Sequence, residues 1–171
     1  ACLYGVLRPG DTLVAATGRP YDTLEEVIGI RGERGNGSLA DLGVSYKQVD
    51  LKDNKVDYDA LRAAIDPRVK AVEIQRSKGY AWRDSFSVDE IGEIISFVKS
   101  INKDIICIVD NCYGEFVDTK EPTEVGADLM VGSLIKNPGG GLARSGGYIA
   151  GSARCVELVS YRLTCPGIGR E

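Results

Sequence analysis

The chain has 171 residues, about the length of one domain, and 43% of them are hydrophobic while 27% are charged. This composition excludes a mainly disordered chain, because there is enough apolar surface to bury a core. The formal net charge of −4 argues against non-specific electrostatic binding to nucleic acid. The longest uninterrupted apolar run, Ile105 to Val109, is too short to span a membrane.

The sequence contains no histidine, and its five cysteines show no C-x-x-C spacing. The lack of histidine excludes Ser-His-Asp and Cys-His catalysis and also zinc sites that use histidine. Proton transfer must therefore use lysine, tyrosine, cysteine, carboxylates or a cofactor. An odd number of cysteines without metal-ligand spacing predicts neither a disulfide framework nor a metal site, so we expect a reducing, cytoplasmic setting.

Strand and helix signals alternate along the first half of the chain. The apolar run 12–16 follows a Pro-Gly-Asp turn and predicts a strand, and residues 22–28 predict a helix with acidic residues in its first turn. Residues 31–38 are rich in glycine and charge and predict a loop. Residues 44–49 alternate like a half-buried strand, and an aspartate N-cap predicts a helix over 57–65.

The second half continues the alternation. Residues 70–75 predict a strand, and a capping box followed by apolar residues on one face predicts a helix over 88–101. The run 105–109 is apolar throughout and predicts a strand buried on both faces, and 129–131 and 148–150 predict two further short strands. The whole pattern predicts an α/β fold with a mostly parallel sheet and helices on both faces.

The sequence argues against two nucleotide-binding motifs. Gly35-x-Gly37-x-x-Ala40 matches the dinucleotide fingerprint in its letters, but charged residues precede it where that fingerprint needs an apolar strand. We therefore interpret this segment as a loop. The chain also lacks a Gly-x-x-x-x-Gly-Lys-Ser/Thr sequence, so no P-loop is expected.

Two predicted strands end in residues that carry chemistry. Asp110 directly follows the strand 105–109, and Lys136 follows the apolar segment 129–131 and precedes three consecutive glycines. Ligands bind at the carboxyl ends of strands in open α/β sheets, and partial desolvation there would lower the pKa of a lysine and make it a nucleophile. Taken singly, each residue has a plainer interpretation, a turn-forming aspartate and a surface lysine.

Five segments together resemble one known family. They are PYDTLEEVIG, IQRSKGY, IVDNCYGEF, GSLIKNPGGGLARSGGYIAG and RLTCPGIGRE. In this order they are similar to the methionine gamma-lyase-related family, also called aluminium resistance proteins, among the fold-type I enzymes that use pyridoxal 5′-phosphate. The resemblance implies that residues 1–171 form the central part of one large cofactor-binding domain, with an N-terminal segment and a C-terminal small domain missing.

The resemblance also implies roles for single residues. Lys136 would bind the cofactor covalently and act as the base at the substrate α-carbon, and Asp110 would pair with the pyridine nitrogen. Ser133 matches a phosphate-binding serine, and Tyr21 matches a tyrosine that stacks on the cofactor ring and can move a proton. Tyr21 is alternatively a buried aromatic at a helix start. Ser77 is the candidate for a cofactor contact among residues 75–77, and no metal is expected.

The implied activity is that of a pyridoxal-phosphate-dependent carbon–sulfur lyase of cysteine and methionine metabolism, acting by β- or γ-elimination. The substrate would be a small, sulfur-containing amino acid, and the enzyme a homodimer or homotetramer without nucleic acid or membrane partners. Two alternatives stay open. The same scaffold supports other reactions of this cofactor, such as those of aminotransferases and aldolases, and the chain could be a non-catalytic structural fragment.

Overall fold

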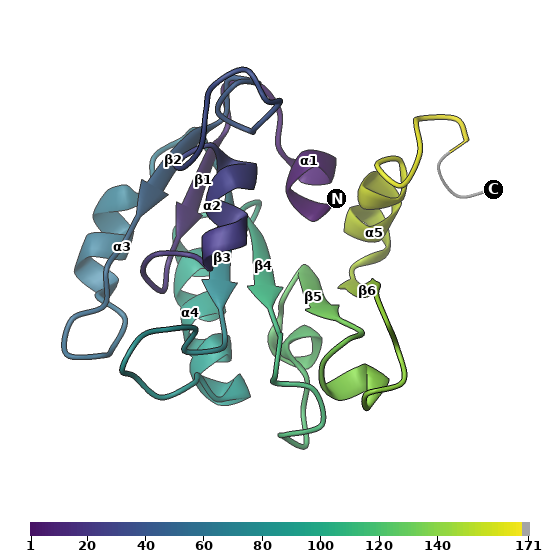
Figure 1. Ribbon diagram of the computed structural model, residues 1–171. Helices are drawn as coiled ribbons and strands as arrows, with labels where there is room; N and C mark the ends of the chain where they lie inside the picture. The colour runs from purple at the N-terminus through teal and green to yellow at the C-terminus, as the bar shows by residue number, and fades with distance from the viewer. Residues whose placement is uncertain (169–171) are drawn as a thin grey trace.

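The computed structural model describes residues 1–168, and these form one six-stranded sheet with helices on both faces (Figure 1). The spatial order of the strands is β2-β1-β3-β4-β5-β6, in which β1 to β5 are parallel and β6 is antiparallel to β5. The strands are β1 (Thr12–Ala15), β2 (Ser45–Gln48), β3 (Val69–Gln75), β4 (Ile106–Asp110), β5 (Leu129–Ser133) and β6 (Gly147–Gly151). The predicted fold class is confirmed.

Two helices, α3 (Tyr58–Ala64) and α4 (Val88–Ile101), cover one face of the sheet. Side chains alternate along a strand, so every second residue of the central strands points to this face, where the residues form a fully buried cluster with both helices. Helix α4 starts at a capping box, in which Ser87 accepts a hydrogen bond from the Glu90 backbone and Glu90 accepts one from the Ser87 backbone. The sequence predicted this helix with the same bounds.

Three helices lie against the other face, namely α1 (Cys2–Val6), α2 (Asp22–Ile28) and α5 (Ala153–Ser160). Helix α1, next to the N-terminus, packs on α5, which follows the last strand (Figure 1). A side chain at Gly5 would place its Cβ 2.8 Å from the Cα of Val159, so the close approach of these helices requires glycine. Only α2 was predicted, while α1 and α5 were missed.

The remaining predictions are confirmed with small changes in the bounds. Strands β5 and β6 are longer than predicted, and two short 3-10 helices, η1 (Pro122–Val125) and η2 (Asn137–Gly139), were not predicted. The segment 35–40 is a loop without helix or strand, as interpreted from the sequence. The last three residues of the block RLTCPGIGRE lie outside the described residues. Within residues 1–168, no helix is long and apolar enough to cross a membrane.

Candidate active site

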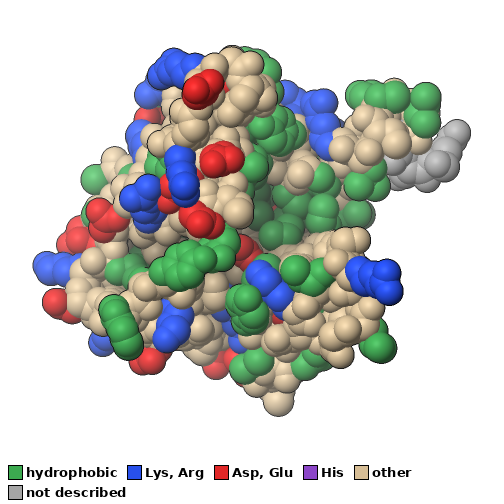
Figure 2. Space-filling model, in the orientation of Figure 1, with side chains coloured by type: hydrophobic (Ala, Val, Ile, Leu, Met, Phe, Trp, Pro, Cys, Tyr) green, Lys and Arg blue, Asp and Glu red, His purple; other side chains and the backbone are tan. Residues whose placement is uncertain are grey.

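A cavity of about 1020 Å³ opens at the carboxyl ends of β3, β4 and β5, on the sheet face that carries α1 and α2. Figure 2 views this face and shows a hollow at its centre with hydrophobic side chains on the walls. The size suits a small organic ligand. The lining residues that carry polar or ionisable side chains are Cys2, Tyr4, Tyr21, Thr23, Glu73, Ser77, Lys78, Tyr80, Ser85, Asp110, Cys112, Tyr113, Lys136 and Tyr148.

Asp110 and Lys136 both line this cavity, as the sequence predicted from the ends of two strands. Asp110 is the last residue of β4, and its Oδ1 accepts a hydrogen bond of 3.0 Å from the backbone N–H of Cys112. Lys136 follows β5, and its Nζ lies 4.5 Å from the centroid of the Tyr113 ring, a cation–π contact. Because β4 and β5 are neighbouring parallel strands, their ends bring the carboxylate and the amine to one site.

The electrostatic environment of Lys136 differs from the sequence prediction. Partial burial lowers the pKa of this amine, but the neighbouring Cys112, Tyr113 and Asp110 outweigh burial and raise the pKa above its ordinary value. The prediction of a lowered pKa is therefore wrong, because it considered desolvation without the acidic groups around the amine. The raised pKa favours the ammonium form of Lys136.

Tyr21 stands at the mouth of the cavity, immediately before α2, and pairs with a second tyrosine. The Tyr21 and Tyr80 hydroxyl oxygens are 2.9 Å apart, and the two rings stack with centroids separated by 5.4 Å. This hydrogen bond raises the pKa of Tyr21 to about 12. The side chain is 38% exposed, so the alternative interpretation of a buried aromatic is wrong.

The two predicted serines lie differently. Ser77 lines the cavity, and its backbone carbonyl accepts hydrogen bonds from Gln75 and from Arg83. Ser133 ends β5, where its Oγ accepts a weak hydrogen bond of 3.4 Å from the backbone N–H of Ile135, but it is not among the lining residues that the structure describes. The structure therefore brings Lys136, Asp110, Tyr21 and Ser77 together and leaves Ser133 beside the cavity.

Sequence reasoning missed a second carboxylate in the cavity, Glu73. It lies inside β3, between apolar neighbours, and is only 3% exposed. Neither carboxylate oxygen has a hydrogen-bond partner in the part of the chain that is described. The sequence did carry a signal for Glu73, namely an acidic residue within an otherwise apolar strand, because such a residue is costly to bury.

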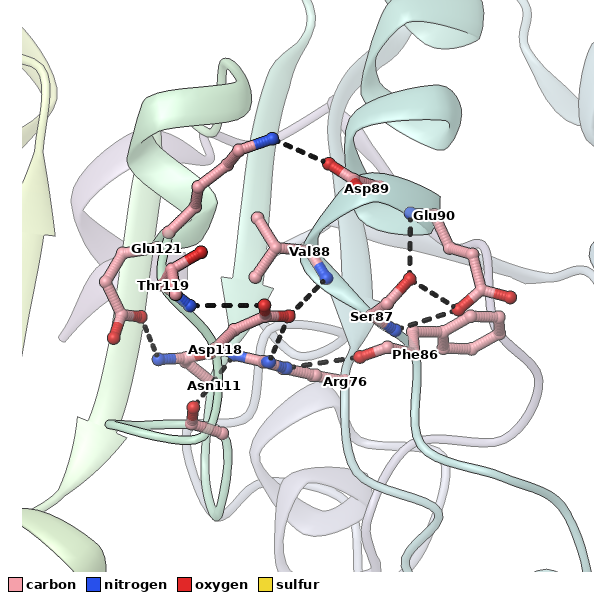
Figure 3. Close-up of polar contacts among 12 residues, drawn as sticks. Arg76, Phe86, Ser87, Val88, Asp89, Glu90, Asn111, Asp118, Thr119 and Glu121 are labelled. Carbon is pink, nitrogen blue, oxygen red and sulfur yellow. Dashed lines mark hydrogen bonds and ion pairs between the residues drawn. The ribbon is translucent and has the colours of Figure 1, made fainter.

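A buried arginine fixes the segments that follow β3 and β4 (Figure 3). The Arg76 guanidinium donates hydrogen bonds to the carbonyl of Phe86 at 3.2 Å, to Oδ1 of Asn111 at 2.8 Å and to the carbonyl of Gly114 at 3.0 Å. Its Nη2 also lies 3.5 Å from Asp118. Since Asn111 directly follows Asp110 in the chain, this network holds the end of β4 in place.

A parallel α/β sheet with a lysine and an aspartate at its carboxyl edge is typical of the large domain of fold-type I enzymes. The family model for methionine gamma-lyase matches residues 1–171, and the chain belongs to this family.

Known relatives agree with this assignment. The chain is 63% identical over 170 residues to the uncharacterised protein YnbB of Bacillus subtilis, covering 99% of this chain and 40% of that protein. A crystal structure from Listeria innocua, named as a candidate cystathionine beta-lyase involved in aluminium resistance, is 58% identical with a TM-score of 0.96, and the match covers 99% of this chain and 41% of that one. A carbon–sulfur lyase involved in aluminium resistance from Clostridium novyi is 54% identical with a TM-score of 0.93, over 98% of this chain and 40% of that one. The chain thus spans about two fifths of the length of these relatives.

The residues in the cavity fit pyridoxal 5′-phosphate. The group needs an amine that reacts with its aldehyde, which Lys136 offers, and a carboxylate for its pyridine nitrogen, which Asp110 offers. The aromatic rings of Tyr21 and Tyr113 line the same space, and the volume exceeds that of a single small cofactor.

Proposed function

We propose that this chain forms the cofactor-binding part of a pyridoxal-phosphate-dependent carbon–sulfur lyase that acts on a small, sulfur-containing amino acid. The observation that carries the proposal is that Lys136 and Asp110 line one cavity at the carboxyl edge of the sheet. Membership of the methionine gamma-lyase family and the similarity to proteins named as carbon–sulfur lyases support it. When bound, the cofactor withdraws electrons from the substrate α-carbon.

The residues of this chain have distinct tasks in such a site. The Asp110 carboxylate would pair with the protonated pyridine nitrogen of the cofactor. The Nζ of Lys136 would have to lose a proton, since its pKa is raised, before it could hold the cofactor through its aldehyde. Once the substrate amine has displaced it, the free amine would be the base at the substrate α-carbon. The Tyr21 hydroxyl, hydrogen-bonded to Tyr80, is placed to hold or deliver a proton at the mouth.

The test is reconstitution of the purified protein with pyridoxal phosphate, followed by borohydride reduction and peptide mapping. We expect a visible absorption band that borohydride removes and a pyridoxyl group on Lys136. Lys136→Ala should abolish both, whereas Lys78→Ala, which removes another lysine of the same cavity, should keep both. A pyridoxyl group on a different lysine, or a complete lack of binding by the full-length protein, would refute the proposal.

The reaction type needs a substrate panel with the full-length protein. Release of a thiol together with a keto acid and ammonia identifies a lyase, and amino transfer that depends on a 2-oxo acid identifies an aminotransferase instead. We further propose a homo-oligomer, which sedimentation of the same preparation tests.

A further inference from the structure

Glu73 occupies an unusual place for a carboxylate. Strand β3 lies between β1 and β4, and Glu73 is in register with Ala15 on one side and Ile108 on the other. Its side chain is 3% exposed and faces the cavity. No group within residues 1–168 donates a hydrogen bond to either oxygen. An ionised carboxylate without donors is far more costly to bury than a neutral acid.

Three titratable groups on neighbouring elements act on Glu73. They are Asp110 on β4, Arg83 in the segment after β3 and Tyr46 on β2. Burial is the largest influence and raises the pKa of Glu73, and the negative charge of Asp110 raises it further. The positive charge of Arg83 lowers it, but the net result is a pKa of about 8.

Arg83 and Tyr46, which could each donate a hydrogen bond to Glu73, donate to other atoms. The guanidinium of Arg83 donates to the backbone carbonyls of Gln75, Ser77 and Asp84. The hydroxyl of Tyr46 donates to the side chain of Gln48 at 3.1 Å. Arg83 therefore acts on Glu73 through its charge and not through a hydrogen bond, and both carboxyl oxygens of Glu73 have no partner in the described part of the chain.

Asp110, in contrast, has a hydrogen-bond donor. It is half-buried at the end of β4 and accepts a hydrogen bond from the backbone of Cys112. Both carboxyl groups line the cavity, but Asp110 has a hydrogen-bond donor, whereas Glu73 has none within residues 1–168 and is 3% exposed. We propose that Glu73 carries a proton at neutral pH and is a positioning residue, which leaves Asp110 as the single carboxylate on the floor of the cavity.

This arrangement has a consequence for ligand binding. A second negative charge at position 73 would act on the same ligand nitrogen as Asp110, and a neutral acid at position 73 leaves that pairing to Asp110 alone. The positioning role rests on the proposed function, whereas the protonation of Glu73 does not.

The experiment measures protonated carboxyl groups in the cofactor-free protein by infrared difference spectroscopy, with glutamate labelled by carbon-13 to separate it from aspartate. We expect a protonated glutamate band at pH 7 that disappears in Glu73→Gln and persists in Glu93→Gln, a matched change at an exposed position on α4. The band should titrate near pH 8. Asp110→Asn should shift this titration to lower pH, because a like charge is removed.

Two outcomes would show that Glu73 is not protonated as proposed. A glutamate at position 73 that is ionised at pH 7, or a titration that Asp110→Asn leaves unmoved, overturns the inference. If Glu73→Gln does not fold, the labelled wild-type protein and Asp110→Asn still give the decision.

The positioning role is tested by the pH dependence of cofactor affinity. We expect the affinity of the wild type for pyridoxal phosphate to fall as the pH rises past about 8, where Glu73 ionises, and Glu73→Gln to lack this fall; the same pH dependence in both proteins overturns the role. A protonated Glu73 in a full-length protein that binds no pyridoxal phosphate supports the protonation and refutes the proposed function.

Discussion

Replacing Arg76 by alanine tests whether the buried guanidinium holds the active-site edge together. Arg76 is 3% exposed and donates to three oxygen atoms, the carbonyls of Phe86 and Gly114 and the side chain of Asn111. Each oxygen left without a donor costs about 1–3 kcal/mol, but water reaches part of the space, because the nearby Asp118 is 39% exposed. We therefore expect a total loss of about 3–5 kcal/mol, the range for breaking one side of a buried charged network.

The assay is equilibrium unfolding in urea of the wild type and the variants, with the slope of the transition compared to confirm a common mechanism. Arg34→Ala removes an exposed arginine of a loop and should change the free energy of unfolding by less than about 0.5 kcal/mol. Arg76→Lys keeps the charge but lacks the planar set of donors of a guanidinium. Its loss in the free energy of unfolding should therefore lie between those of Arg34→Ala and Arg76→Ala.

The result also bears on the cavity, because Asn111 follows Asp110. Once Arg76 is removed, the Asn111 side chain keeps only its contacts to Glu121 and Tyr148. Cofactor affinity should then fall together with stability. A loss of stability below about 1 kcal/mol for Arg76→Ala, the size of an ordinary surface change, would refute this reasoning.

Three further predictions concern single contacts. A Cβ at Gly132 would collide with Glu115 Oε1, so Gly132→Ala should cost about 1–3 kcal/mol and lower the melting temperature in thermal unfolding. Ser87→Ala removes the cap of α4 and should cost about 1 kcal/mol in urea unfolding. Asp66 accepts a hydrogen bond from Lys47, which lowers the pKa of Asp66 to about 2. Its stabilising contribution is therefore complete above the ordinary pKa of 3.8 and is lost as the pH falls through about 2. Asp66→Asn should thus be less stable than the wild type at pH 7, and the difference should shrink steadily as the pH is lowered from about 4 to about 2.

The fold could be predicted well because its signals are local. Helix α4 carries a capping box and an apolar face, and β4 is an apolar run, so both are defined by their own residues. Helix α1 has five residues and no side-chain cap, and its helical state depends on packing against α5. Helix α5 did carry a signal, since Ser152 accepts a hydrogen bond from the backbone of Cys155 as an N-cap. That signal was missed.

The candidate site could be predicted only in part. Which residues meet follows from where the strands end, whereas the pKa of a residue depends on the side chains around it. Asp110 and Lys136 meet because parallel strands end at one edge, a rule that needs no side-chain detail. The pKa of Lys136 depends on Cys112 and Tyr113, which come from the loop after β4 and whose orientation the sequence does not give. Ser133 illustrates the same limit, since its place at the end of β5 was correct but the described lining of the cavity does not include it.

Glu73 shows what information was missing. In the sequence, an acidic residue within KAVEIQ fits an edge strand with one face in water as well as it fits a central strand. The strand order decides between these cases, because β3 lies between β1 and β4 and helices cover both faces of the sheet. Strand order follows from contacts between distant segments, which no local pattern encodes. Once β3 is known to be central, Glu73 is recognised as a buried acid without a hydrogen-bond donor in the described part of the chain and not as a surface acid. Its protonation state then bears on the function of the cavity.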